Sequence, residues 1–505
     1  MKKQLLTGHA RYLVGIVLMA VLLLAGCRQG KVPAAYTDLK KAPTIYPDYR
    51  DVTVPVNMAP LRFELMDEAE EVVARLTADG RELVLEGRKV MPDIDEWREL
   101  AKAGETVTVE LFSRQQEQWH RYQPFHIYVS PDSIDPWLSY RLISPSYVTF
   151  EDLTINQRSL EDYEEREIYN NMLCSTEASG QCINCHSYQA GQPDRMQFHA
   201  RQNLGGTLIL LDGQLRKVDL KCDSTISAGV YPAWHPTQHL IAYSTNATMQ
   251  MFHLSDLNKI EVLDSRSDLI LYDIDRNEVC NVEAAPDEFE VFPSWSPDGR
   301  YLYYCSAHFE LNDTIGAEAE AIMRYKEIKY NIYRKRFDEQ TRSFGPRELV
   351  FDAAASGLSA TLPRISPDGR FLLLSVGEWG CFHIWHKDAD LWLVDLGSGE
   401  ARPLKEVNST DVEAYHTWSS SGRWIVFSSR RTDGTYTRPF FAHVDRDGHA
   451  TKPFELPSAD PDYHRQLLKS YNVPELMKGP VSVSPHAFAD ALRQEAVRAH
   501  FVSKE

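Results

Sequence analysis

The chain has 505 residues, with 54 Lys and Arg against 72 Asp and Glu, a formal net charge of −18 and a sequence pI of about 5.4. A surface this acidic argues against nucleic acid and anionic lipid surfaces as partners. The length exceeds that of one typical domain and predicts two or three domains.

The first 27 residues predict export. Lys2 and Lys3 precede an almost wholly apolar run at residues 12–25. This run is shorter than the roughly 20 residues that a membrane span needs, but it suits the apolar region of a signal peptide. It ends in "LAGC" at residues 24–27, which resembles a bacterial lipobox. The resemblance implies that Cys27 is lipidated. An ordinary signal peptide or an uncleaved anchor is the alternative.

Residues 28–45 are polar and contain proline, as in a tether from a membrane. From residue 46 to 150 short alternating stretches such as "TVTVELFSR" and "FHIYVS" predict strands, and we expect a small β-sandwich-like domain. One helix interrupts these strands at residues 93–104, with Asp93 as its N-cap and Gly104 as its stop.

Residues 151–204 change in composition, and "SLEDYEEREIYNNMLC" is typical of a helix with acidic residues in its first turns. We expect a compact helical segment here. It carries "QCINCHSY" at residues 181–188, a C-x-x-C-H motif. This motif suits a covalent haem, a redox dithiol or half of a zinc site.

The surroundings of the motif favour a haem. A zinc site needs two more ligands at regular spacing, and Cys174 and His199 are irregularly placed. A redox dithiol normally follows a strand in a βαβ unit, and no such pattern is present.

A c-type haem needs Cys182 and Cys185 for the thioethers and His186 as the proximal iron ligand, in an exported protein. The sixth ligand is then expected to be Met196, with His199 as its rival. A degenerate motif that receives no haem is the alternative.

From residue 205 to 457 the chain repeats itself. The units "YPAWHPTQHLIAYSTN", "FPSWSPDGRYLYYCSA", "LPRISPDGRFLLLSVG" and "YHTWSSSGRWIVFSSR" align on the anchors Trp234, Trp295, Ile365 and Trp418. In each unit a strand ends, a tight turn follows and a second strand returns. Radial repetition of such sheets predicts a β-propeller.

The units "SWSPDGRYLYY" and "RISPDGRFLLL" resemble the TolB-type, WD40-like propeller repeat, also called PD40. The resemblance implies five or six blades. The tail at residues 458–505 predicts helical pieces that pack on the outside of the propeller or close it. The whole chain resembles envelope lipoproteins of Bacteroidetes in which a cytochrome c motif precedes a TolB-like propeller.

These observations predict a mainly β protein that is lipid-anchored in a bacterial envelope, with the outer membrane favoured. We expect a cytochrome with one covalent haem c that transfers electrons and docks a redox partner or another envelope protein through its propeller. A TolB-like scaffold with a structural or absent haem is the first alternative, and a haem-dependent periplasmic enzyme is the second. No catalytic motif stands out, so an electron carrier or binding protein is favoured over an enzyme.

Overall fold

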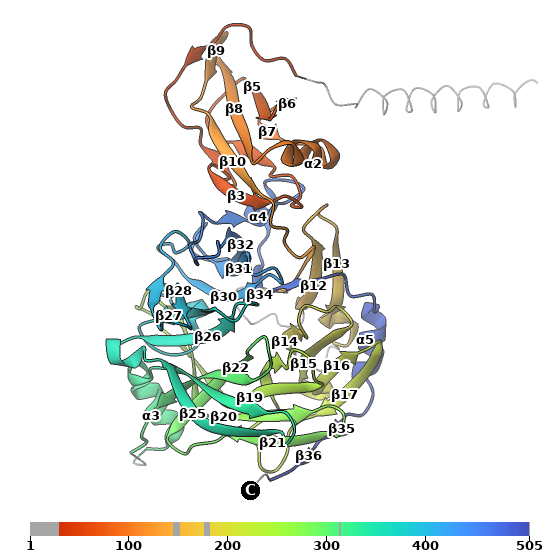
Figure 1. Cartoon of the computed structure of the whole chain (residues 1–505), viewed down its shortest axis with the longest axis vertical. Helices are drawn as coiled ribbons and strands as arrows, with labels where there is room; N and C mark the ends of the chain where they lie inside the picture. The colour runs from red at the N-terminus through yellow and green to blue at the C-terminus, as the bar shows by residue number, and fades with distance from the viewer. Residues whose placement is uncertain (1–29, 145–151, 176–181, 313–314, 504–505) are drawn as a thin grey trace, which may run out of the picture.

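A computed structural model describes residues 30–144, 152–175, 182–312 and 315–503, except for the side chain of Asn203. The lipobox and Cys27 lie outside these ranges. An N-terminal domain, red to orange in Figure 1, stands on a ring of sheets formed by the rest of the chain. Within the described ranges no helix is long and apolar enough to span a bilayer.

The N-terminal domain is sandwich-like, as predicted. Its larger sheet has seven strands, which are β1 (Thr37–Asp38), β3 (Val52–Pro55), β5 (Glu71–Ala78), β6 (Arg81–Glu86), β8 (Thr106–Gln115), β9 (Gln118–Arg121) and β10 (Phe125–Ser130). Its smaller sheet has three, which are β2 (Ile45–Tyr46), β4 (Phe63–Leu65) and β7 (Lys89–Val90). The predicted helix is α2 (Ile94–Ala103), and the Asp93 side chain caps it by accepting from the Asp95 amide.

The remaining five sheets form six blades of a propeller, because the nine-stranded sheet comprises blades 3 and 4, which are joined by the pairing of β20 with β22. Blade 1 has β11 (Trp137–Ile143), β12 (Thr154–Ser159), β13 (Glu165–Asn170) and β34 (Ser470–Met477). Blade 2 has β14 (Cys182–Tyr188), β15 (Arg195–Arg201), β16 (Gly206–Leu211), β17 (Gln214–Asp219) and β35 (Val497–Arg498). Blade 3 has β18 (Val230–Trp234), β19 (Leu240–Phe252), β20 (Ile260–Asp273), β21 (Glu278–Glu283) and β36 (His500–Phe501).

The other three blades follow in chain order. Blade 4 has β22 (Glu288–Trp295), β23 (Tyr301–His308), β24 (Asn331–Asp338) and β25 (Ser343–Phe351). Blade 5 has β26 (Ser359–Ile365), β27 (Phe371–Gly377), β28 (Asp390–Asp395) and β29 (Ala401–Pro403). Blade 6 has β30 (Glu413–Trp418), β31 (Trp424–Ser429), β32 (Arg438–His443) and β33 (Phe454–Glu455).

The C-terminal tail closes the ring. Its strand β34 pairs antiparallel with β11, so the first and last parts of the propeller share blade 1. The tail then forms the helix α5 (Pro485–Leu492) and adds β35 and β36 to the edges of blades 2 and 3. The short helices are α3 (Ala317–Met323), α4 (Tyr463–Gln466), η2 (Asn171–Leu173), η3 (Gln202–Leu204), η4 (Tyr325–Glu327), η5 (Ala354–Ser356) and η6 (His383–Trp385).

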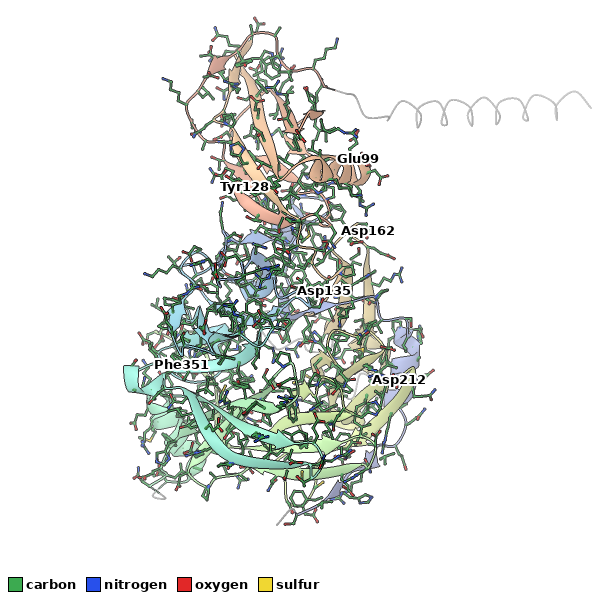
Figure 2. All side chains as sticks on the ribbon, viewed as in Figure 1. Glu99, Tyr128, Asp135, Asp162, Asp212 and Phe351 are labelled. Carbon is green, nitrogen blue, oxygen red and sulfur yellow. The ribbon has the colours of Figure 1, made fainter. Side chains whose placement is uncertain are left out.

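The N-terminal domain and the propeller share one hydrophobic core. Trp424 and Phe441 of blade 6 belong to the same buried cluster as Val52 and Val129 of the N-terminal domain. In the segment between β10 and β11, which joins the two parts, the Asp135 carboxylate accepts from the Ser420 amide at 2.7 Å; Figure 2 labels Asp135 in the upper part of the propeller. The contact is therefore a packed interface.

The inner strands of the six blades, β14, β18, β22, β26, β30 and β34, contact one another around the ring. Each carries a β-bulge against its partner strand. Each also has one residue with a left-handed backbone at the bulge; φ lies between 46° and 57° at Cys185, Tyr231, Phe292, Leu362, Tyr415 and Val473. A bulge redirects a side chain out of the sheet's alternation, and all six of these residues line the central channel.

Fold class and repeat register are confirmed. The predicted anchors Trp234, Trp295, Ile365 and Trp418 end four equivalent inner strands, each three residues beyond the left-handed position. The ring has six blades, within the predicted five or six.

Three predicted boundaries need correction. The described part of residues 151–204 is not mainly helical, because it supplies strands to blades 1 and 2 and, among the residues described, only two single-turn helices, η2 and η3. The predicted tether contributes β1, which pairs with β9. The tail forms strands as well as helices. In the tether and the tail, pairing with a distant strand overrides local propensity, whereas in residues 151–204 antiparallel pairing of consecutive strands does so.

Candidate binding site in the propeller channel

The channel holds a cavity of about 560 Å³ lined by residues from the inner strands of all six blades. A second cavity of about 350 Å³ lies next to it and shares four lining residues with it, Ser187, Pro232, Arg364 and Glu475. These four residues mark the boundary between the two cavities. The larger cavity is within the size range of small-molecule sites in proteins, about 300–1,000 Å³.

The C-x-x-C-H motif lies on β14 and faces this cavity. Cys182, Cys185 and His186 are all among the lining residues. Both cysteines are partly exposed, and neither forms a disulfide with another described cysteine. Burial raises the pKa of the Cys185 thiol, so this thiol is protonated at neutral pH.

Cys185 has a left-handed backbone, φ 57°, but so do the equivalent residues of the other five blades. Such strain often marks a functional site. In this protein the left-handed backbone occurs in all six blades and is therefore a property of the repeat. The residue after it is more informative, because four blades have proline at that position: Pro232, Pro293, Pro363 and Pro474. Blades 2 and 6 have His186 and His416 instead.

The two histidines differ in their partners. The Nε2 atom of His416 lies 3.1 Å from the carbonyl oxygen of Leu373. His186 is 2% exposed, and within the described ranges neither of its ring nitrogens has a hydrogen-bond partner. Burial, and next the charge of Arg141, lower the pKa of His186 to about 3. His186 is therefore a neutral imidazole, the form that binds metals. Its nitrogens make no hydrogen bond of good geometry within the described ranges, although the nearby Val473 backbone opposes the fall in its pKa.

The charged side chains of the cavity are mostly basic. Arg141, Arg201 and Arg364 line it, and Glu475 is its one acidic lining residue among those described. Burial raises the pKa of Glu475 to about 7, while the charge of Arg364 opposes this rise. The carboxyl of Glu475 is therefore only partly ionised at neutral pH.

Aromatic rings form much of the remaining wall. Tyr231, Phe292 and Phe382 pack together with ring centroids 4.6 to 5.8 Å apart. Trp385 and Tyr415 also line the cavity. The site therefore combines flat apolar surfaces with a few cationic groups, which is the composition of many ligand sites.

The predicted sixth ligand lies elsewhere. Met196 is on β15 with no exposed surface, and it belongs to a buried cluster formed by blades 1 and 2 and α5. His199 is 6% exposed, and its Nδ1 lies 3.2 Å from the Thr207 hydroxyl. Neither residue lines the cavity. Among the described residues no group of three His, Cys, Asp or Glu side chains is arranged to hold a metal ion.

The residues of the motif itself fit a c-type haem, because two thiols and a neutral, unpartnered imidazole line one cavity. Sequence reasoning identified these three residues but missed the rest of the site. The six left-handed positions are spread over almost 300 residues, and no residue type is common to all six. One feature of the sequence indicates that the motif belongs to the repeat: Tyr188 follows Cys185 by three residues, as Trp234 follows Tyr231.

Fold and site together define the class: a six-bladed β-propeller with a ligand-sized cavity in its channel. No known protein family and no curated protein matches the sequence. Among solved structures, TolB from Acinetobacter baumannii aligns at TM-score 0.41 and 12% identity, over 76% of this chain and 85% of that one. A mutant of the Synechocystis apocarotenoid oxygenase aligns at TM-score 0.35 and 10% identity, over 84% and 95%. Prolyl oligopeptidase B from Galerina marginata, bound to a 25mer macrocyclization substrate, aligns at TM-score 0.37 and 9% identity, over 80% and 54%.

Proposed function

We propose that this chain is a binding protein of the cell envelope and that its ligand site is the propeller channel. The observation that supports this most strongly is the cavity of about 560 Å³ to which all six inner strands contribute side chains. The apolar run before Cys27 supports export, and an acidic surface suits a soluble body outside the cytoplasm. The shared core of the two domains makes the propeller a rigid frame for such a site.

The two channel cysteines allow a direct test of where a ligand binds. N-ethylmaleimide reacts with exposed thiols, and Cys182 and Cys185 are reached from the cavity. Cys174 is also partly exposed but does not line the cavity, so it is an internal control. A neutral fluorescent probe, N-phenyl-1-naphthylamine, should slow the labelling of Cys182 and Cys185 and leave Cys174 unchanged. Binding of the probe without this protection would exclude the channel.

A second candidate function is electron transfer by a c-type haem. It is favoured by His186, which replaces the proline of four other blades and has no partner for either nitrogen. Cys182 and Cys185 would hold the haem covalently, and His186 would bind the iron. Such a group supplies one-electron chemistry. The arginines of the channel would bind its carboxylates.

The haem proposal has its own readout. Full-length protein produced in a host that matures c-type cytochromes should show a Soret band and a covalent increase in mass. Changing both Cys182 and Cys185 to Ala should abolish the covalent increase in mass, whereas Cys174→Ala should not. A wild-type protein without the band and with two free channel thiols would reject the haem and leave the binding proposal intact.

A further inference from the structure

The charge of the channel is opposite to that of the chain. The chain carries a formal net charge of −18, whereas the larger cavity is lined by three arginines and one glutamate. A cleft lined by one sign of charge raises the local concentration of ligands of the opposite sign. This contrast indicates a site for an anion inside an otherwise acidic molecule.

The three arginines are not equally available. Arg141 donates from Nη1 to the Ile183 carbonyl at 2.9 Å and from Nη2 to Asn472 Oδ1 at 2.8 Å. Arg201 donates to the side-chain oxygen of Asn184 at 2.8 Å once that amide is oriented to accept. Both guanidinium groups are therefore held at least in part by neighbouring strands.

Arg364 is different. It lies on β26, two residues beyond the left-handed Leu362, and it lines both cavities. Its backbone carbonyl accepts from Trp418 Nε1, but its side chain has no hydrogen bond or ion pair within the described ranges. The guanidinium also makes no ion pair with Glu475, although their charges interact. Arg364 therefore keeps its donors for a ligand.

The apolar wall lies beside these donors. Tyr231, Phe292 and Phe382 line the same cavity as Arg364, and their rings pack into one cluster. A guanidinium binds carboxylate, sulfonate or phosphate oxygens through paired hydrogen bonds, and aromatic rings take up the flat apolar body of a ligand.

We propose that the channel binds a small organic anion with an aromatic or other apolar body, and that Arg364 makes the principal contact with its charged group. This inference rests on the proposed function and names the ligand class of the same site. Because the cavity is of drug-molecule size, the ligand is a small molecule.

Two probes with one skeleton test the ligand class. 8-Anilinonaphthalene-1-sulfonate carries a sulfonate, and N-phenyl-1-naphthylamine is the same skeleton without it. With the full chain we expect saturable binding of both, and about ten- to hundredfold tighter binding of the sulfonate, because a charge-assisted hydrogen bond has that effect. Arg364→Gln should remove the difference, and Arg364→Lys should restore part of it.

The controls separate the possible outcomes. Unchanged binding of the neutral probe to Arg364→Gln shows that the variant is folded with an intact cavity. Arg336→Gln changes an exposed arginine of β24 outside the channel and should change neither affinity. The anion proposal is overturned if the two probes bind the wild type with equal affinity. It is also overturned if Arg364→Gln leaves the affinity for the sulfonate probe unchanged. Failure of both probes to bind the wild type contradicts the binding function as well.

Discussion

At the scale of the residue, position within the repeat decides how each side chain should be interpreted. Cys185 and His186 form a motif in the sequence, but in the structure they occupy the left-handed position and the proline position of blade 2. The strained backbone at Cys185 therefore needs no functional explanation. The histidine that follows it does, because its nitrogens are buried without partners.

Glu290 is a buried acid that makes stability depend on pH. It has no exposed surface, its Oε1 accepts from the Ala285 amide at 3.2 Å, and its Oε2 has no partner within the described ranges. Burial raises the pKa of Glu290 to about 9, from an ordinary value of 4.5. The folded chain therefore holds this proton at pH values where the unfolded chain has lost it.

The sign of the effect follows from proton linkage. Between pH 4.5 and about 9 Glu290 is protonated more often in the folded state than in the unfolded state, so its contribution to stability falls as the pH rises. Glu290→Gln should raise the free energy of unfolding at pH 7 by about 1–3 kcal/mol, and this gain should vanish near pH 4.5. Denaturant unfolding at several pH values measures it, with the exposed Glu82→Gln as control. A gain of the same size at pH 4.5 and pH 7 would contradict the assignment.

At the scale of the element, the anchor tryptophans connect neighbouring blades. Trp295 Nε1 donates to the Ala233 carbonyl at 3.1 Å, and Trp418 Nε1 donates to the Arg364 carbonyl at 3.1 Å. Each bond runs from one inner strand to another. Trp234 ends the equivalent strand β18, but its Nε1 has no partner within the described ranges. The three tryptophans therefore occupy equivalent positions and differ in whether the indole N–H makes a hydrogen bond.

Replacing each anchor by phenylalanine should separate the hydrogen bond from the packing. All three variants lose similar apolar volume, whereas only Trp295→Phe and Trp418→Phe remove a hydrogen bond to a neighbouring inner strand. We expect these two to be destabilised by about 1–3 kcal/mol more than Trp234→Phe, measured by denaturant unfolding. Equal losses at all three positions would show that the hydrogen bonds contribute nothing.

Several of these elements could be predicted from the sequence and others could not. The tight turn expected in the unit "FPSWSPDGRYLYYCSA" is confirmed, because Gly299 has φ 72° and the Ser296 hydroxyl donates to Asp298 at 2.6 Å. The sequence does not identify the strand β14, because it lacks both the anchor tryptophan and the "SPDGR" turn, whereas each of the four aligned units has at least one of them. Local patterns identify turns. The segment β14, in contrast, is a strand because it pairs with β15 and lies between the inner strands β34 and β18 of the ring.

At the scale of the whole molecule, the closed ring creates the site. Residues as distant as Arg141 and Asn472 meet because β34 pairs with β11, and together they line the channel cavity. No single repeat encodes this cavity, so it could not be predicted from the sequence. The sequence does predict the fold, which is a propeller. It also identifies one segment that lines the channel, the C-x-x-C-H motif.

The most direct test of the account is the protection of Cys185 from N-ethylmaleimide, followed by peptide mass spectrometry of the full chain at pH 8.5. With saturating N-phenyl-1-naphthylamine we predict labelling of Cys182 and Cys185 slowed at least about tenfold, since a filled cavity excludes the reagent, and labelling of Cys174 unchanged. Gln250→Trp, which places a large ring at a lining position, should abolish both probe binding and protection. Equal labelling of all three cysteines with and without bound probe would contradict the claim that the channel is the binding site.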